Sequence, residues 1–249
     1  MNVRRILKAS TIICIVLAPL VFVYARPLSL LLAAKRRART APELWIVPKP
    51  LTDTSIERSA GRKFSCFGYQ FEVPWTDVKQ EKNSKSMDII HFANDTVVIF
   101  FDPAQRADLL EELTQQGTKN ESALKNILPD EATRSNYSLR STILYLTPRD
   151  LRLFSSRREM VSNSVLLMLK PMWADAKKGG LYAFQTEWLR GFQDGDPPHK
   201  SVTIYAFDAQ DHEIELAIAS EQSTSHDFTQ SEVNRILYSL RPVPMAQSE

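Results

Sequence analysis

The first forty residues constrain this chain most, because they combine a long apolar run with eight basic residues and no acidic one. Residues 11–25 are an apolar run of fifteen residues, and residues 28–34 form a second run after Arg26 and Pro27. A helix that spans a bilayer needs about 20 mostly apolar residues. The first run is therefore short, whereas residues 9–34 are long enough but include a charged side chain.

Three interpretations of this segment remain open. We favour an uncleaved single-pass anchor over residues 9–34, because Pro19 is tolerated in membrane helices and Arg26 can reach toward the headgroups. Small residues at Val23 and Ala25 also fit a cleaved secretory signal. The third interpretation is a helix buried in the protein or lying on its periphery. The sequence thus predicts the lipid bilayer as a partner through residues 9–34.

The side of the membrane on which the domain lies is harder to predict, because basic residues flank the apolar segment on both sides. Basic residues before a signal-anchor favour a cytoplasmic N-terminal head, so we expect an exported domain on the periplasmic or extracellular side. The basic cluster at residues 35–39 fits either anionic headgroups or a stop-transfer flank.

Net charge excludes one class of partner. The whole chain carries +2, and the first forty residues alone carry +8, which leaves −6 on the remainder. A net acidic domain lacks the positive surface that binds a phosphate backbone, so no nucleic-acid partner is expected. Cys14 lies in the apolar run and Cys66 in the domain, so the domain holds no internal disulfide.

The chain divides by composition into five parts. We predict a basic head (1–8), a membrane anchor or signal segment (9–34), a basic flank with a proline-containing linker (35–60), one globular domain (61–243) and a flexible tail (244–249).

Alternating apolar residues predict several strands in the domain. We expect one strand over residues 65–75, a hairpin over 87–102 with a two-residue turn at Asn94–Asp95, and a final hairpin over 201–220. We also expect a strand over 182–192, with one face formed by Tyr182, Phe184, Trp188 and Phe192. In the first hairpin this turn places Ile90 and Phe92 on the same face as Val97, Ile99 and Phe101.

Helical patterns occupy the middle and the end of the domain. We expect helices after Asp102, over residues 123–128 and 137–146, after Ser156, and after Thr229. The helix after Ser156 should run through Met172 with a kink at Pro171. The order of elements predicts an α+β fold in which an antiparallel sheet packs against helices.

The opening pattern FGYxFEVPW at residues 67–75, the final hairpin and a closing helix that ends in Ser239-Leu240-Arg241-Pro242 resemble the PsbP-like α+β sandwich. The same opening strand resembles bacterial membrane-anchored proteins of unassigned function. The central helical block, residues 103–176, is larger than this pattern expects. The resemblance implies a non-catalytic binding or assembly role and supplies no site residues.

Catalytic and metal-binding signatures are absent from the sequence. The four histidines, His91, His199, His212 and His226, show no metal-ligand spacing. In the stretch 212–215, a strand would place Glu213 and Glu215 on one face and His212 on the other. We assign no catalytic, cofactor-binding or metal-binding residue and expect no cofactor.

Three functional hypotheses follow. The leading one is a membrane-anchored protein whose domain is a non-catalytic binding or assembly module at the cell envelope, with a protein partner at the membrane. The second is a hydrolase-like enzyme, which requires a cleft joining His91 or His212 to a carboxylate and a hydroxyl. The third is a carrier of a small apolar ligand, which requires an internal cavity beside the strand at 182–192.

Overall fold

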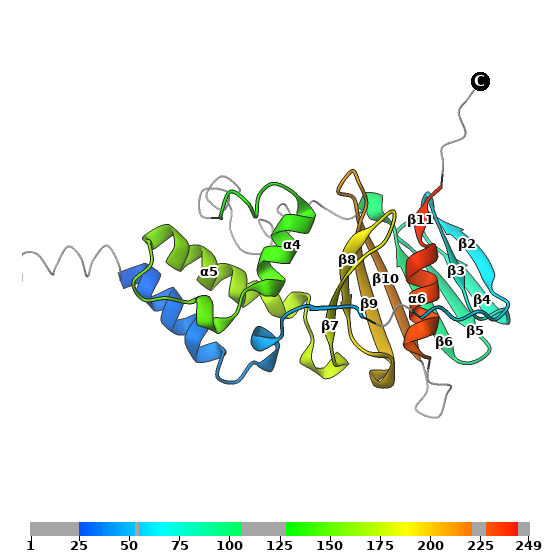
Figure 1. The fold of residues 1–249 in the computed structure, drawn as a ribbon, viewed down its shortest axis with the longest axis horizontal. Coiled ribbons are helices and arrows are strands. Elements are labelled where there is room, and N and C mark those ends of the chain that lie inside the picture. Colours follow the sequence, from blue (N-terminus) through cyan, green and yellow to red (C-terminus); the bar gives the residue numbers. More distant parts are fainter. Residues whose placement is uncertain (1–24, 53–54, 106–127, 221–227, 244–249) are drawn as a thin grey trace, which may run out of the picture.

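The computed structural model describes residues 25–52, 55–105, 128–220 and 228–243 (Figure 1). Two sheets and four α-helices make up this part of the chain, which confirms the predicted α+β class. The large sheet has eight strands in the order β1-β7-β8-β9-β10-β6-β5-β4, and the small one has three in the order β11-β3-β2. The strands are β1 Lys49–Pro50, β2 Arg62–Cys66, β3 Tyr69–Val73, β4 Val78–Asn83, β5 Met87–Phe92, β6 Thr96–Phe101, β7 Leu181–Gln185, β8 Arg190–Asp194, β9 Ser201–Phe207, β10 Glu213–Ser220 and β11 Arg241–Pro242.

The four helices are residues 25–37, α4 Asn136–Tyr145, α5 Arg157–Leu169 and α6 Gln230–Ser239. Single 3-10 turns follow or link them: η1 Pro42–Trp45, η2 Pro103–Gln105, η3 Pro148–Asp150, η4 Lys170–Met172, η5 Ala176–Lys178 and η6 Pro197–His199. No helix of the described residues is both long and apolar enough to cross a bilayer. Predicted helix 123–128 lies almost wholly outside the described residues, as does most of the one after Asp102.

Both faces of the large sheet are covered. Helix α6 and the small sheet cover one face, where Val233, Ile236 and Leu237 join Phe71 and Phe100 in the main core. The helices at the other end of the molecule cover the opposite face, where α4 and α5 pack on β7, β8 and β9 (Figure 1). The large sheet is mixed and not antiparallel throughout, because β1 runs parallel to β7.

The predicted single strand at 65–75 is a hairpin. β2 and β3 pair across Phe67 and Gly68, which both have positive φ, at 48° and 81°. Two such residues in succession make the tight turn whose twist matches that of paired strands, and glycine adopts this conformation without strain. The expected alternation holds within β3, where Tyr69, Phe71 and Val73 are buried.

The predicted register of the β5–β6 hairpin is wrong by one residue. Ile90 pairs with Val98 and His91 with Val97, so Ile90 and Phe92 share the core face with Val98 and Phe100. The connection has three residues, of which Asp95 has a φ of 60°. Changing a two-residue loop to three reverses which residues share a face, because side chains alternate with a period of two.

The predicted strand at 182–192 is also a hairpin. Thr186 starts its turn: its side chain oxygen accepts from the backbone N–H of Trp188 (3.3 Å) and of Leu189 (3.0 Å). β7 and β8 then pair, with Ala183 opposite Phe192. Phe184 and Phe192 consequently lie in different cores, on opposite faces of the sheet, and Trp188 projects from the turn.

Helix starts follow their predicted capping residues. Ser156 caps α5 by accepting from the Glu159 N–H (3.2 Å), and Thr229 caps α6 together with Glu232. Glu232 also accepts from the indole N–H of Trp75 (2.9 Å), which ties the end of the opening hairpin to α6. The predicted kink at Pro171 is instead an end: α5 stops at Leu169, and Pro171 lies in the turn η4.

The second apolar run of the N-terminal segment packs against the protein itself. In the helical segment 25–37, Leu31 and Ala34 are fully buried in a cluster with Leu151, Met160 and Leu167. Ala38 and Leu44 extend this cluster into the predicted linker, and β1 then pairs with β7. Residues 9–24 of the predicted anchor and the predicted tail, 244–249, lie outside the described residues.

This packing predicts different effects for two neighbouring leucines. Leu31→Ala should lower the free energy of unfolding by about 2–4 kcal/mol, because Leu31 is 0% exposed and its loss leaves a cavity. Leu32→Ala should cost much less, because Leu32 is 54% exposed. Chemical denaturation of both variants in detergent measures the difference; equal effects would contradict this packing.

A buried ion pair joins α4 to the centre of the large sheet. Arg140 Nη2 donates to Glu213 Oε1 at 2.7 Å, and Arg140 is only 2% exposed. The guanidinium lies over the rings of Tyr205 (4.2 Å to the centroid), Trp173 (5.0 Å) and Phe207 (5.7 Å). No atom of the described chain accepts a hydrogen bond from Arg140 Nε or Nη1, so the aromatic faces take the place of acceptors.

Removing this cation should strongly destabilise the protein. We expect Arg140→Met to lower the free energy of unfolding by about 3 kcal/mol, because Glu213 keeps its buried charge and loses this partner. Adding Glu213→Gln should restore part of that loss. Arg134, which is exposed and lies two positions before the first residue of α4, provides the control as Arg134→Met. Urea unfolding of the wild type, both single variants, the double variant and the control measures the coupling, with Glu213→Gln as the second single variant; strictly additive losses would contradict it.

Candidate binding groove around Trp188

The β7–β8 turn presents an exposed tryptophan on a rigid support. Besides the two bonds to the Thr186 hydroxyl, the Thr186 N–H donates to the Leu189 carbonyl at 2.7 Å. Leu189 is buried in the main core, whereas Trp188 is 47% exposed. Trp188 therefore extends from a fixed turn, and it lines two cavities of about 300 and 320 Å³.

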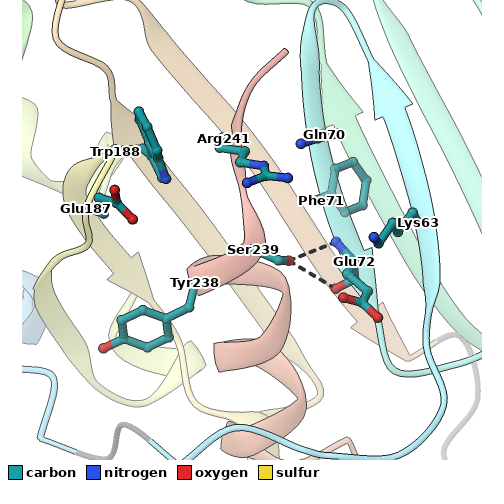
Figure 2. Close-up of a pocket in the computed structure, with 9 residues that line it drawn as sticks. All are labelled: Lys63, Gln70, Phe71, Glu72, Glu187, Trp188, Tyr238, Ser239 and Arg241. Carbon is teal, nitrogen blue, oxygen red and sulfur yellow. Dashed lines mark hydrogen bonds between the residues drawn. The ribbon is translucent and has the colours of Figure 1, made fainter. Parts of the chain in front are cut away.

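The first cavity lies where the turn faces α6 and the small sheet (Figure 2). Glu187 and Trp188 form one side, and Arg241 of β11 stands between them and β3. Its lining combines three aromatic residues with four charged ones. The lining residues are Lys63, Gln70, Phe71, Glu72, Glu187, Trp188, Tyr238, Ser239 and Arg241.

Ion pairs and hydrogen bonds fix the side of the cavity that is formed by β3 and β11. Glu72 Oε1 accepts from Arg235 Nη2 at 2.7 Å, and Arg235 also donates to the backbone carbonyls of Glu57 and Ser59. With its amide oxygen turned toward Arg241, Gln70 accepts from Arg241 Nη2 at 2.7 Å. Two of the four charged lining residues, Glu72 and Arg241, are thus held in position.

Ser239 in this groove is not available as a nucleophile. Its hydroxyl donates to backbone carbonyls, the shortest bond going to Arg235 at 2.6 Å, and accepts from the Glu72 N–H at 2.8 Å. Its hydrogen-bonding capacity is therefore used by the end of α6 and by β3 (Figure 2). A nucleophilic serine needs a base as its partner, and the residues lining this cavity include no histidine.

His212 does meet a carboxylate and a hydroxyl, but in an order that does not suit nucleophilic catalysis. Asp208 Oδ2 accepts from the Tyr69 hydroxyl (2.8 Å) and lies 3.0 Å from His212 Nδ1. The carboxylate stands between the other two groups, whereas a catalytic triad places the histidine between the acid and the nucleophile. Burial and the bond to Asp208 hold the pKa of Tyr69 well above its usual range. Asp208 Oδ1 also accepts from two N–H groups of the β9–β10 turn, so we interpret the cluster as the lock of that hairpin.

The remaining sequence candidates stay apart. Glu213 pairs with Arg140, and His212 with Asp208, so stretch 212–215 does not converge on one point. His91 is half-buried on β5 and pairs in register with Val97. Across the residues that the structure describes, no group of three or more histidine, cysteine or acidic side chains could hold a metal ion. His226 lies outside them.

Cys66 lies in the main core, 5% exposed. Burial, with a smaller contribution from neighbouring Asp88, raises the pKa of its thiol to about 12. Thiolate is the reactive form, so Cys66 is inert near neutral pH.

A third cavity of about 570 Å³ lies at the β1–β7 edge of the large sheet. Leu51, Tyr182, Pro197, Pro198 and Phe228 give it a mostly apolar lining, with Thr52, Asp196, Thr229 and Gln230 as polar groups. Asp196 accepts from the Gly180 N–H at 2.7 Å, and burial together with Asp196 raises the pKa of Tyr182 to about 12. This cavity lies beside Tyr182 but opens to the surface, whereas the carrier hypothesis requires an internal cavity.

Sequence reasoning placed Trp188 in a core strand and did not single out Arg140, Asp208 or Arg241. One signal for the groove was present: Thr186 precedes Trp188 by two positions, a spacing at which a threonine hydroxyl can bond the backbone N–H and form a turn. Comparison with protein-family models, with curated proteins and with solved structures finds no match to this chain.

Lys170, buried beside α5, predicts a pH dependence of stability. Its Nζ donates to the Leu146 carbonyl at 2.6 Å, and burial lowers its pKa from 10.5 to about 8. Between these two pH values the unfolded chain holds more protons at this residue, so Lys170 makes stability rise with pH there. Above pH 9 the raised pKa of Cys66 acts in the opposite sense.

The variant Lys170→Met isolates this contribution. From pH 8 to 10 the wild type should gain about 2 kcal/mol of unfolding free energy relative to the variant. Because Cys66 and the tyrosines are common to both proteins, their losses cancel in the difference. Urea titrations at closely spaced pH values provide the measurement, and parallel pH profiles for the two proteins would refute the assignment.

Proposed function

We propose that this protein is a membrane-anchored, non-catalytic binding module that holds a polypeptide segment of a partner in the groove around Trp188. The observation that carries the proposal is an exposed tryptophan on a rigid turn above a preformed groove with both positive and negative residues on its rim. Exposed aromatic and arginine side chains are the residue types that contribute most to protein interfaces.

A polypeptide suits this groove better than a small apolar ligand or an anion. Lys63 and Arg241 supply positive charge, while Glu72 and Glu187 supply negative charge. A segment with an apolar side chain for Trp188 and a charge of each sign would pair with both. A simple anion would meet the carboxylates and be repelled.

The anchor and the exported orientation belong to the same proposal. The apolar run at residues 11–25 and the basic residues on its flanks support membrane attachment, with the domain on the periplasmic or extracellular side. The PsbP-like sandwich is likewise proposed as the finer description of the fold. It agrees with a binding role and rests on the opening hairpin, the last hairpin and the closing helix.

A carrier of a small apolar ligand is the second candidate, favoured by the cavity at the β1–β7 edge. The two proposals require different residues for binding. Polypeptide binding in the groove requires Trp188, whereas binding of an apolar ligand at the sheet edge requires Tyr182. A hydrolase-like enzyme has less support, because Asp208 stands between Tyr69 and His212.

Photo-crosslinking in intact cells tests the groove. We expect the full-length protein with p-benzoylphenylalanine at position 188 to form a discrete adduct, which Arg241→Glu abolishes without changing the protein level. The matched control is position 45, since Trp45 is 46% exposed but lies near the helical end. Identical adducts at both positions, or an adduct indifferent to Arg241→Glu, would count against the groove.

Two fractionation experiments test the location. Alkaline extraction should leave the full-length protein in the membrane pellet, and release into the supernatant would contradict the anchor. Protease added to intact cells or to cells with an opened outer envelope should degrade the domain; protection until the inner membrane is lysed would place the domain in the cytoplasm.

A further inference from the structure

The helical end of the molecule exposes large apolar side chains that no part of the described chain covers. Phe154, in the loop between η3 and α5, is 101% exposed, and Leu153 beside it is exposed as well. In the helical segment 25–37, Leu28 and Leu32 are also exposed. We call these four residues the apolar tip.

The two parts of the apolar tip belong to one packed unit. Leu151 and Met160, which flank the loop, lie in the same buried cluster as Leu31 of the helix. Figure 1 shows the beginning of α5 next to the first described turn of this helix, at the end of the molecule farthest from α6 and β4. Leu28 and Leu32 lie four positions apart and hence on one flank of the helix, outside the buried face.

Basic side chains accompany the apolar tip. The stretch 25–44 contains five basic residues and one acidic residue, and the stretch 149–159 contains four and two. Arg26, Arg36, Arg152 and Arg157 are all exposed. The rest of the domain is net acidic, so positive charge is concentrated where large apolar side chains are also exposed. This combination matches a surface that inserts apolar side chains among anionic lipid headgroups.

The place where the preceding chain joins the domain indicates that a lipid bilayer covers the apolar tip. The described part of this helix starts at residue 25, directly after the apolar stretch of residues 11–24, so a chain anchored through that stretch enters the domain at the apolar tip. We propose that the apolar tip docks onto the surface of an anionic bilayer, with Phe154 and Leu153 in the headgroup region and the neighbouring arginines on lipid phosphates. This inference rests on the proposed membrane attachment and adds a second, peripheral contact to it.

Site-specific labelling tests this proposal directly, because neither native cysteine need interfere. Cys14 is replaced by serine, and Cys66 is buried with a raised thiol pKa, so a maleimide reacts with an introduced cysteine alone. The full-length variant Phe154→Cys is labelled with the fluorophore NBD and reconstituted in phosphatidylcholine–phosphatidylglycerol vesicles. The matched control carries the label as Lys82→Cys, on the exposed strand β4 at the opposite end of the molecule (Figure 1).

Label at position 154 should emit at shorter wavelength and lose intensity when headgroup-proximal doxyl lipids are present, whereas label at position 82 should do neither. The blue shift should diminish in phosphatidylcholine alone and with Arg152→Glu/Arg157→Glu. A blue shift without lipid quenching would show that protein covers the apolar tip, the chain's own N-terminal run or a second copy, and would overturn the inference.

Failure of the docking and failure of the anchor give different results. If the labelled protein floats with vesicles after alkaline treatment and position 154 still behaves like position 82, the apolar tip does not dock although the anchor holds. If the protein leaves the vesicles on alkaline treatment, the membrane attachment itself is wrong. Equal shifts with and without phosphatidylglycerol would refute the part assigned to the arginines.

Discussion

The fold depends on covering both faces of one large sheet, and the Arg140–Glu213 pair is where that requirement is hardest to meet. Glu213 starts β10, a central strand, and its carboxylate lies on the face covered by the helices. Arg140 brings α4 onto that face and supplies the compensating charge between three aromatic rings. Since an unpaired charge there would cost several kcal/mol, this contact fixes how the helices sit on the sheet.

The sequence predicted elements better than their pairing. Period-two alternation located β3, β5, β6, β9 and β10, and capping residues located the starts of α5 and α6, because these signals are local. It missed the turns at Phe67–Gly68 and at Thr186, and each omission merged two strands into one. A turn depends on backbone dihedrals and on side chain to backbone bonds that hydrophobic patterning does not record.

The same reasoning explains why the candidate groove was not predicted. In a continuous strand Trp188 would share a face with Phe184 and Phe192 and belong to the core, but in a turn it points to solvent. Lys63, Glu72 and Arg241 lie on the three strands of the small sheet, and Arg241 is far from the other two in sequence. Trp188 comes from the large sheet, so its meeting with them depends on how the small sheet packs on the large one. Arg140 and Glu213 likewise are 73 residues apart and gave no local signal.

The two proposed surfaces are compatible because they lie on different parts of the molecule. The apolar tip is at the helical end, while the groove lies between the β7–β8 turn, α6 and β11, across the large sheet from α4 and α5 (Figure 1, Figure 2). A domain docked on lipid through its tip would therefore hold the groove away from the bilayer and open to a polypeptide. Residues 42–52 cross from the helices to the sheet edge and pair with β7, so they connect the two parts directly and do not act as a free tether. An anchored domain built in this way would present its groove at a defined height above the membrane.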